Sequence, residues 1–360
     1  MRRTLLFSST LVLLMGAGVA YAGSSNTLYI DQSGDGNTAN VDQSNGPGGN
    51  DIGTPGDPVN QTGNNNSFNF SNAGCCNTNN RYNNDVNKAE QVGDNNWLNI
   101  HVWNLAHDNV VSDAQQLGNT NRLLIEQNGS NYGTVGTILQ DGDVNSAYIG
   151  QGGSNNTVSN VEMVGSNNGY SNTMSMASGR FDSLRIRQGG SGNLVNHARI
   201  EGDNNKQIPS NGYAPLLDIY QSGSNNGLTS SVATMLGSNG NGIKVTEIGD
   251  WNNFSVMQGT STASTGNYAT VTQTGSYNDA TVTQFGSYNQ LVVTQLDDGN
   301  SSTTNFTGDS NGVGTLTGVA GGLTNVNLVE GSVYQNSTGA GSGNSLTYNV
   351  TGSNNLAISQ

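Results

Sequence analysis

The 360-residue sequence is poor in the residues that build most globular enzymes. Charged residues make up 10% of the chain and hydrophobic residues 32%, and there are 5 prolines and 2 cysteines. So few apolar side chains can form only a thin core. Beyond Val19 no apolar run approaches the roughly 20 residues that a membrane helix needs, so we expect no membrane insertion.

Cysteine is confined to the neighbours Cys75 and Cys76. A bridge between adjacent cysteines has poor geometry, and the count excludes a disulfide framework. The two residues are either incidental parts of a loop or a link between molecules.

Positive charge is also scarce, since the formal net charge is -14. Phosphate backbones and anionic membranes attract basic surfaces. Nucleic acid is therefore not an expected partner.

The first residues predict a secretory signal peptide over 1–22. Arg2 and Arg3 precede an apolar run from Leu5 to Val19, and Ala20 and Ala22 supply the small residues of a cleavage site. We expect the mature chain to begin at Gly23 and to be exported.

A repeat is what the chain does have. Three consecutive eleven-residue units align without a gap from Asn267 to Asn300, with the template apolar-x-Gln-x-Gly-x-x-Asn. The template recurs along most of the chain, in places with the glutamine replaced, as in Val245-Glu247-Gly249-Asn252. Self-similarity at a fixed period is the signature of a solenoid.

Each unit alternates in the manner of a half-buried strand and ends in turn chemistry. In Asn267 to Gly275 the odd-numbered positions fall on one side and Tyr268, Thr270, Thr272 and Thr274 on the other. Glycine and asparagine tolerate the positive φ of a turn. The sequence thus predicts an all-β fold, a β-solenoid of strand-turn-strand coils with about 22 residues per coil and two facing parallel sheets.

The inward amides should form ladders, because each lies above its equivalent in the next coil and a buried amide needs a partner. The predicted structural ladder comprises Gln32, Gln61, Gln140, Gln151, Gln188, Gln221, Gln273, Gly275, Asn278, Gln284, Gly286, Asn289, Gln295 and Asn300. A disordered Gln/Asn-rich tract is the alternative, but such tracts do not keep an eleven-residue phase.

We expect residues 23–360 to form one repeat domain with loop insertions near 44–58, 73–88, 170–182, 206–215, 259–266 and 317–330. A stacked strand cannot spare its N–H groups. All five prolines indeed fall outside the units, at Pro47, Pro55, Pro58, Pro209 and Pro215.

Units such as Asn267 to Asn278 and Asn278 to Asn289 resemble the curlin repeat of curli fibre subunits. The resemblance implies a secreted functional amyloid of the biofilm matrix, a structural subunit rather than an enzyme, with no cofactor. It implies as partners further copies of the chain, a related nucleator or major curlin subunit, and an outer-membrane export pore. The location would be an extracellular fibre on the bacterial surface, reached through the periplasm.

Catalytic, metal-binding and cofactor-binding residues are not predicted. His101, His107 and His197 are scattered, and no serine-nucleophile or phosphate-loop motif occurs. A calcium β-roll is disfavoured because Asp does not keep phase in the repeat. Ice binding is disfavoured because consecutive units lie on opposite faces, which breaks up any array of paired threonines.

The alternative function is a non-fibrillar secreted β-solenoid adhesin that binds host or matrix surfaces. Outward aromatic residues at Tyr29, Tyr148 and Tyr220, together with the insertions, would supply its contacts. A basic outward cluster of Arg185, Arg187, His197 and Arg199 would bind an acidic partner or a neighbouring subunit, or would discourage premature stacking.

Overall fold

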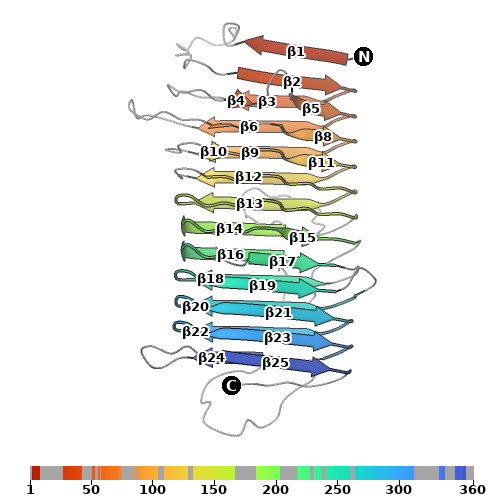
Figure 1. Ribbon diagram of the computed structural model, residues 1–360. Coiled ribbons are helices and arrows are strands. Elements are labelled where there is room, and N and C mark those ends of the chain that lie inside the picture. The colour runs from red at the N-terminus through yellow and green to blue at the C-terminus, as the bar shows by residue number, and fades with distance from the viewer. Residues whose placement is uncertain are drawn as a thin grey trace.

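The computed structural model describes residues 2–8, 27–42, 51–52, 56, 58–73, 84–85, 88–103, 109–128, 133–166, 184–202, 217–227, 231–236, 241–259, 264–311, 332–336 and 345–353. Within these ranges every regular element is a strand, and the strands stack into a two-sided coil that runs along one axis (Figure 1). The N-terminal strands lie at one end of the stack and β25 (Ser345–Thr351) at the other.

One face of the coil is an 11-stranded parallel sheet, called the long sheet below. From the N-terminal end it contains β3 (Thr38–Asp42), β6 (Ser67–Ala73), β9 (Trp97–Trp103), β12 (Arg122–Asn128), β13 (Ser146–Gly152), β14 (Leu184–Ser191), β16 (Leu217–Ser224), β18 (Gly242–Ile248), β20 (Tyr268–Thr274), β22 (Gln290–Leu296) and β24 (Ser332–Asn336).

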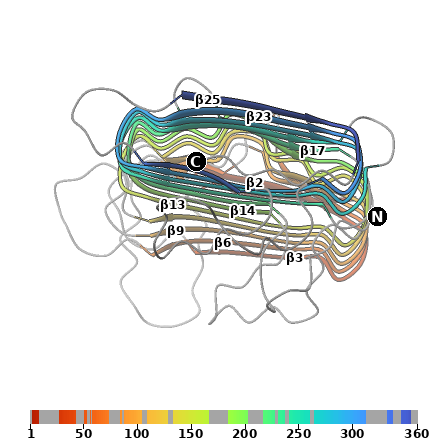
Figure 2. The same ribbon diagram turned by 90° about the horizontal axis from the view of Figure 1, so that it is seen from below.

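The opposite face, called the split sheet, is formed by two 6-stranded sheets. Its first part holds β2 (Thr27–Ser33), β5 (Val59–Thr62), β8 (Glu90–Val92) and β11 (Gln115–Leu117), and its second part holds β15 (Ala198–Ile200), β17 (Ser231–Met235), β19 (Asn253–Gln258), β21 (Asp279–Phe285), β23 (Ser301–Thr307) and β25. Isolated parallel bridges connect the two parts: Leu117 pairs with Asp141, Asp141 with Val164, and Val164 with Glu201. The two faces seen along the axis form two layers (Figure 2).

Four short or peripheral strands complete the described structure. β1 (Arg2–Ser8) pairs antiparallel with β2, and β4 (Asp51–Ile52) pairs with β2 as well. β7 (Asn84–Asp85) pairs with β10 (Asn109–Val110). β1 falls within the expected signal peptide, whose residues 9–22 lie outside the described residues.

The predicted all-β solenoid with two facing parallel sheets is therefore confirmed. Its coil length varies: stacked Gln273 and Gln295 are 22 residues apart, whereas stacked Asn305 and Asn349 are 44 apart. The extra residues fall in the connections between strands. The expected insertions 170–182, 206–215 and 317–330 lie outside the described residues, as do large parts of 44–58 and 73–88, part of 259–266, and both cysteines.

Tight turns occupy one edge of the solenoid in its N-terminal half and the other edge in its C-terminal half. The first turn column follows strands and bridges of the split sheet and comprises Gly34, Gly63, Gly93, Gly118, Gly142 and Gly165. The second follows strands of the long sheet and comprises Gly153, Gly190, Gly223, Gly249 and Gly275, with Asp297 in the next coil. A third, with Gly286, Gly308 and Gly352, returns to the split sheet. Both edges carry tight turns only around residues 138–165 and 267–311 of the described chain.

The turn backbone differs from the sequence-based expectation in one respect. Positive φ falls on the glycine and on the third residue of Gly-x-x-Asn, as at Gly275 (115°) and Tyr277 (60°), and the closing Asn278 is not among the positive-φ residues. The asparagine is required instead for its side-chain bonds, as the next section describes.

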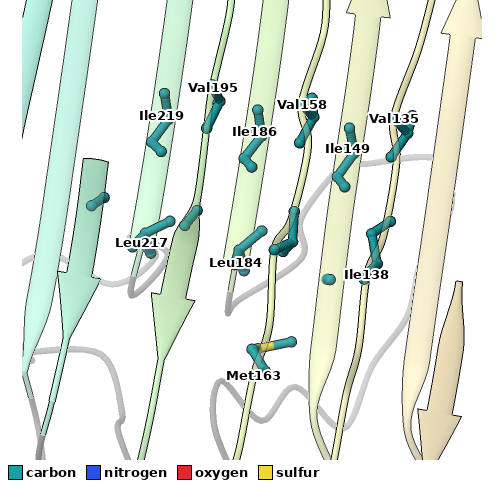
Figure 3. Packing of buried hydrophobic residues seen from close by; sticks show 14 of the residues in the cluster. Val135, Ile138, Ile149, Val158, Met163, Leu184, Ile186, Val195, Leu217 and Ile219 are labelled. Carbon is teal, nitrogen blue, oxygen red and sulfur yellow. The ribbon is translucent and has the colours of Figure 1, made fainter. Parts of the chain in front are cut away.

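The core is one layer of inward side chains shared by the two sheets. Ile149, Ile186 and Ile219 of the long sheet stand in a row beside Val158 and Val195 of the opposite face (Figure 3). All are buried. Because each coil adds only a few apolar residues, neighbouring coils complete one another's core.

Candidate functional site: the polar ladders of the stacked coils

In the described part of the chain, no three His, Cys, Asp or Glu side chains gather in a way that could hold a metal ion. The described residues also include no helix long and apolar enough to cross a membrane. The features that repeat through the molecule are the polar contacts between coils.

The glutamines form three side-chain columns inside the solenoid. In the first, Gln32 donates to Gln61 and Gln61 donates to Gln91 at 2.8 Å. In the second, Gln151 donates to Gln188 and Gln188 to Gln221, both at 2.9 Å, and further along Gln273 donates to Gln295 at 2.9 Å. In the third, Gln258 donates to Gln284 at 2.8 Å. Most of these side chains are fully buried.

The same amides tie the two sheets together. From Gln61 onward the Nε2 atoms also donate to a backbone carbonyl of the facing sheet, as Gln273 does to Asn253 O at 2.9 Å and Gln295 to Asp279 O at 2.9 Å. Gln140 donates to Arg122 O in this way, while its own Oε1 accepts no hydrogen bond. The side-chain amide of a buried Gln thus hydrogen-bonds to a backbone carbonyl of the facing sheet and to the glutamine of the next coil.

Three buried glutamines absent from the predicted ladder belong to these columns. Gln91 and Gln116 fit the template, whereas at Gln258 the glycine follows one residue after the glutamine instead of two. Only the alternation of inward and outward residues along the strand could have identified Gln258 as an inward position. Glu247 takes a glutamine position in the second column, where it accepts from Gln221 Nε2 at 2.8 Å.

The asparagines that close the turns bind the backbone of the next coil. Asn278 Oδ1 accepts the Asn300 N–H at 2.9 Å, and Asn278 Nδ2 donates to Asp297 O at 2.8 Å. Asn267 relates in the same way to Asn289 N–H and to Gly286 O. Glutamine side chains thus bond each other along parts of these columns, but not at Gln116 and Gln140, whose Oε1 atoms accept no hydrogen bond. Asparagine instead acts mainly as a clamp on the backbone, although Asn300 Nδ2 also donates to Asn278 Oδ1 at 3.1 Å.

The turn glycines permit the close approach of the coils. A Cβ on Gly249 would lie 2.0 Å from Gly275 O, and one on Gly275 would lie 2.3 Å from Asp297 O. These glycines have φ values above 90°, which other residues rarely adopt. Gly286 stands in the third column under the same constraint, 2.2 Å from Gly308 O.

A further ladder lies on the exposed side of the turns. Backbone N–H groups at the second turn position donate to the side chain of the next coil, as Asn64 does to Asp94 and Asn119 to Asp143. Asp35, Asp94 and Asp143 alternate with asparagine, so carboxylates of neighbouring coils do not face each other. Asp94 and Asp143 thus act as hydrogen-bond acceptors at every second coil of this turn column.

The outer faces carry the charged and aromatic side chains. Arg185 donates to the buried Asp218 at 3.0 Å, and Arg187 lies over the ring of Tyr220 at 4.8 Å. Arg199 lies on the split sheet, opposite Arg185 and Arg187, and forms an ion pair with Glu201 there. The predicted basic cluster is therefore wrong as a single cluster, because consecutive units fall on opposite sheets.

The predicted outward tyrosines are likewise divided between the faces. Tyr29 lies on β2, whereas Tyr148 lies on β13 and Tyr220 on β16. Tyr148 donates to Glu126 at 2.8 Å, and burial together with that carboxylate raises its pKa. The most exposed aromatic side chains of the described residues are on turns instead, where Trp251 and Tyr277 stack at 6.3 Å.

Together these contacts make each coil a template for the next one. A coil offers outward a row of backbone groups, a Gln amide, and an Asn clamp, and its neighbour accepts all three in register. Such an arrangement orders the polypeptide. Together with the fold, it fits a structural protein.

Comparison with known families matches two segments to the curlin associated repeat, residues 136–159 and 265–296. These are the regions where tight turns close the coil on both edges. A comparison with curated proteins gives no match. The match confirms the resemblance drawn from the sequence, and proteins of this repeat family are structural rather than enzymatic. These two segments of the chain therefore carry the curlin associated repeat.

Proposed function

We propose that the chain is a structural subunit of extracellular curli-like amyloid fibres, which form biofilm matrix and support surface adhesion. Subunits stack end to end, so that the last coil of one molecule receives the first coil of the next. The fibre is a homopolymer of this chain and needs no cofactor.

The observation that carries the proposal is the identity of the contacts from coil to coil. Between β20 and β22, and again between β21 and β23, the same backbone register and Asn clamps recur at 22 residues. A Gln bond joins β20 to β22, whereas Phe306 takes the glutamine position in β23. A terminal coil presents this set with no coil beyond it, which makes a long, flat strand edge. Edge strands of this kind add further strands.

Export and partners follow from the same proposal. Removal of the signal peptide 1–22 takes away β1, which pairs with β2, and leaves β2 as an open edge. The mature chain then passes through the periplasm and an outer-membrane export pore to the cell surface. A related nucleator or major curlin subunit starts or carries the polymer.

The experiment blocks one edge. Interior strands donate the N–H of their first residue to the next coil, as Asp279 does to Asn300 O at 2.8 Å, and Ser345 is the equivalent residue of the terminal strand β25. Proline at Ser345 and Thr347 removes donors directed at the next molecule, and proline is tolerated at such positions. Ser345→Pro with Thr347→Pro is compared with Ser345→Ala with Thr347→Ala, which keeps both N–H groups.

Every junction uses one such edge, so we expect the proline pair to slow fibre elongation about tenfold or more, in line with roughly 1 kcal/mol for each lost bond. The alanine pair should elongate like the parent. Equal elongation by all three proteins would contradict end-to-end stacking. A mature chain that stays monomeric would favour the adhesin function instead, with the exposed aromatic turn residues as contacts.

A further inference from the structure

The second glutamine column contains one acid, Glu247, in the middle of β18. Its side chain is fully buried. Strand register places Glu247 between Gln221 of β16 and Gln273 of β20. Gln221 Nε2 donates to Glu247 Oε2 at 2.8 Å, as a glutamine of the ladder does to its neighbour.

The next rung lacks a donor. Glu247 Oε1 and Gln273 Oε1 are both buried, and neither has a hydrogen-bond partner. In the first column the oxygens of Gln116 and Gln140 lack a hydrogen-bond donor, whereas in the second column the Nε2 of one glutamine donates to the Oε1 of the next, as between Gln188 and Gln221. Here two oxygens occupy the places of a donor and an acceptor, on adjacent strands in register.

Rotation of the Gln273 amide would not repair the rung at lower cost. Gln273 Nε2 already donates to Gln295 Oε1 and to Asn253 O, both at 2.9 Å. Turning the amide toward Glu247 would break both bonds and leave buried acceptors unsatisfied. A proton on Glu247 supplies the missing donor with no such loss.

We propose that Glu247 is a proton-carrying rung of the ladder: its neutral carboxyl donates from Oε1 to Gln273 Oε1, and loss of the proton opens the solenoid between β18 and β20. Ionisation leaves a buried negative charge against the Gln273 oxygen, with no cation beside it. The chain would then separate into an N-terminal and a C-terminal stack at this level.

The charged groups around Glu247 agree with a neutral form. Asp279 of β21 is the carboxyl whose charge acts on it. Asp218 of β16 is paired with Arg185, and Lys244 of β18 is exposed. β17 and β19 carry no titratable side chain, and β20 carries only Tyr268.

Burial accounts for the direction of the titration. Desolvation raises the pKa of Glu247 to about 8, the Gln221 bond opposes this, and the Asp279 charge adds to it. The unfolded carboxyl has a pKa near 4.5. Because the folded pKa is the higher one, the stabilisation is complete below pH 4.5 and is lost as pH rises through about 8.

The test uses the mature chain held as monomer at low concentration, with Glu247→Gln as the matched variant. Glutamine restores the all-amide column, so E247Q should fold at least as well as the parent. Amide hydrogen exchange read by strand should show β18 and β20 of the parent losing protection above about pH 8. In E247Q those strands should stay protected, while β6 and β9 behave alike in both proteins.

A second readout observes the proton itself. Near pH 6 the parent should show an infrared band of a protonated carboxyl that E247Q lacks. Asp279→Asn should shift the transition of the parent slightly downward in pH, because it removes a negative charge that raises the pKa of Glu247. The proposal is overturned if parent and E247Q lose protection at the same pH, or if the band is absent.

Discussion

Asn278 and Asn300, 22 residues apart, occupy the same turn position in successive coils, and the side-chain oxygen of the first accepts the backbone N–H of the second at 2.9 Å. The amide nitrogen of Asn278 binds the carbonyl of Asp297 in the same turn. One side chain therefore hydrogen-bonds both a backbone donor and a backbone acceptor of the neighbouring coil.

Replacement of Asn278 by alanine should destabilise the folded monomer by about 2–5 kcal/mol, because two buried backbone groups lose their partner. Asn305 is the matched control. It also bonds the next coil, Asn349 Oδ1 at 2.8 Å, but on the exposed face. Asn305→Ala should cost under about 1 kcal/mol, and urea denaturation measures both. Equal costs would contradict the clamp.

Two adjacent glycines test the close approach of coils. A Cβ at Gly190 would lie 2.0 Å from Gly223 O, at a φ of 101°, whereas a Cβ at Gly189 would meet nothing within 4 Å. Gly190→Ala should therefore prevent the coils from stacking at β14 and lower stability by several kcal/mol, about the size of the largest point effects.

Gly189→Ala should change stability by less than about 1 kcal/mol, since Ala fits a strand position better than Gly does. Thermal unfolding of the two variants beside the parent makes the comparison. If Gly189→Ala is the more damaging change, the glycine column has another role.

The glutamine ladder predicts a difference between inward and outward positions. Replacing Gln273, Gln284 and Gln295 together by Ala should slow assembly markedly, because these buried amides bond the next coil and the facing sheet. Replacing the outward Thr270, Thr272 and Thr283 by Ala should matter less, since their hydroxyls remain solvated. Fibre growth followed by dye fluorescence compares the sets, and equal slowing would refute the distinction.

The fold could be predicted because its information is local and periodic. Val271, Gln273 and Asn278 stand at fixed offsets in the repeat, and the same offsets recur wherever the turns are tight. Alternation then decides which residues face inward. The partner of each Gln is its own equivalent in the next coil, so a period alone is enough to predict the pairing.

Other features depend on which edge and which sheet each unit occupies, and the repeat period does not specify these. The sequence does not reveal that tight turns change edge between Gly142 and Gly153, because both edges use the same template. Nor does it separate Arg185 from Arg199, which lie on opposite sheets. Glu247 reads as a degenerate copy, and only its burial beside an unpaired Gln273 oxygen distinguishes it.

Assembly should begin in the regular block. Asn267 to Asn300 contains consecutive units without proline, and both of its edges are closed by tight turns. Residues 44–88 carry Pro47, Pro55 and Pro58 and longer connections. Synthetic peptides of the two segments at equal concentration should form fibres in that order. Earlier fibres from the 44–88 peptide would move nucleation to the insertions.

Fibre diffraction of the assembled mature chain tests the central claim most directly. Protein diluted from denaturant should form dye-binding fibres whose reflections near 4.7 Å and about 10 Å report stacked coils and facing sheets. The 4.7 Å spacing should lie along the fibre axis, because the coils of one subunit continue into the next. A chain that stays monomeric for days at micromolar concentration and melts cooperatively would contradict the account.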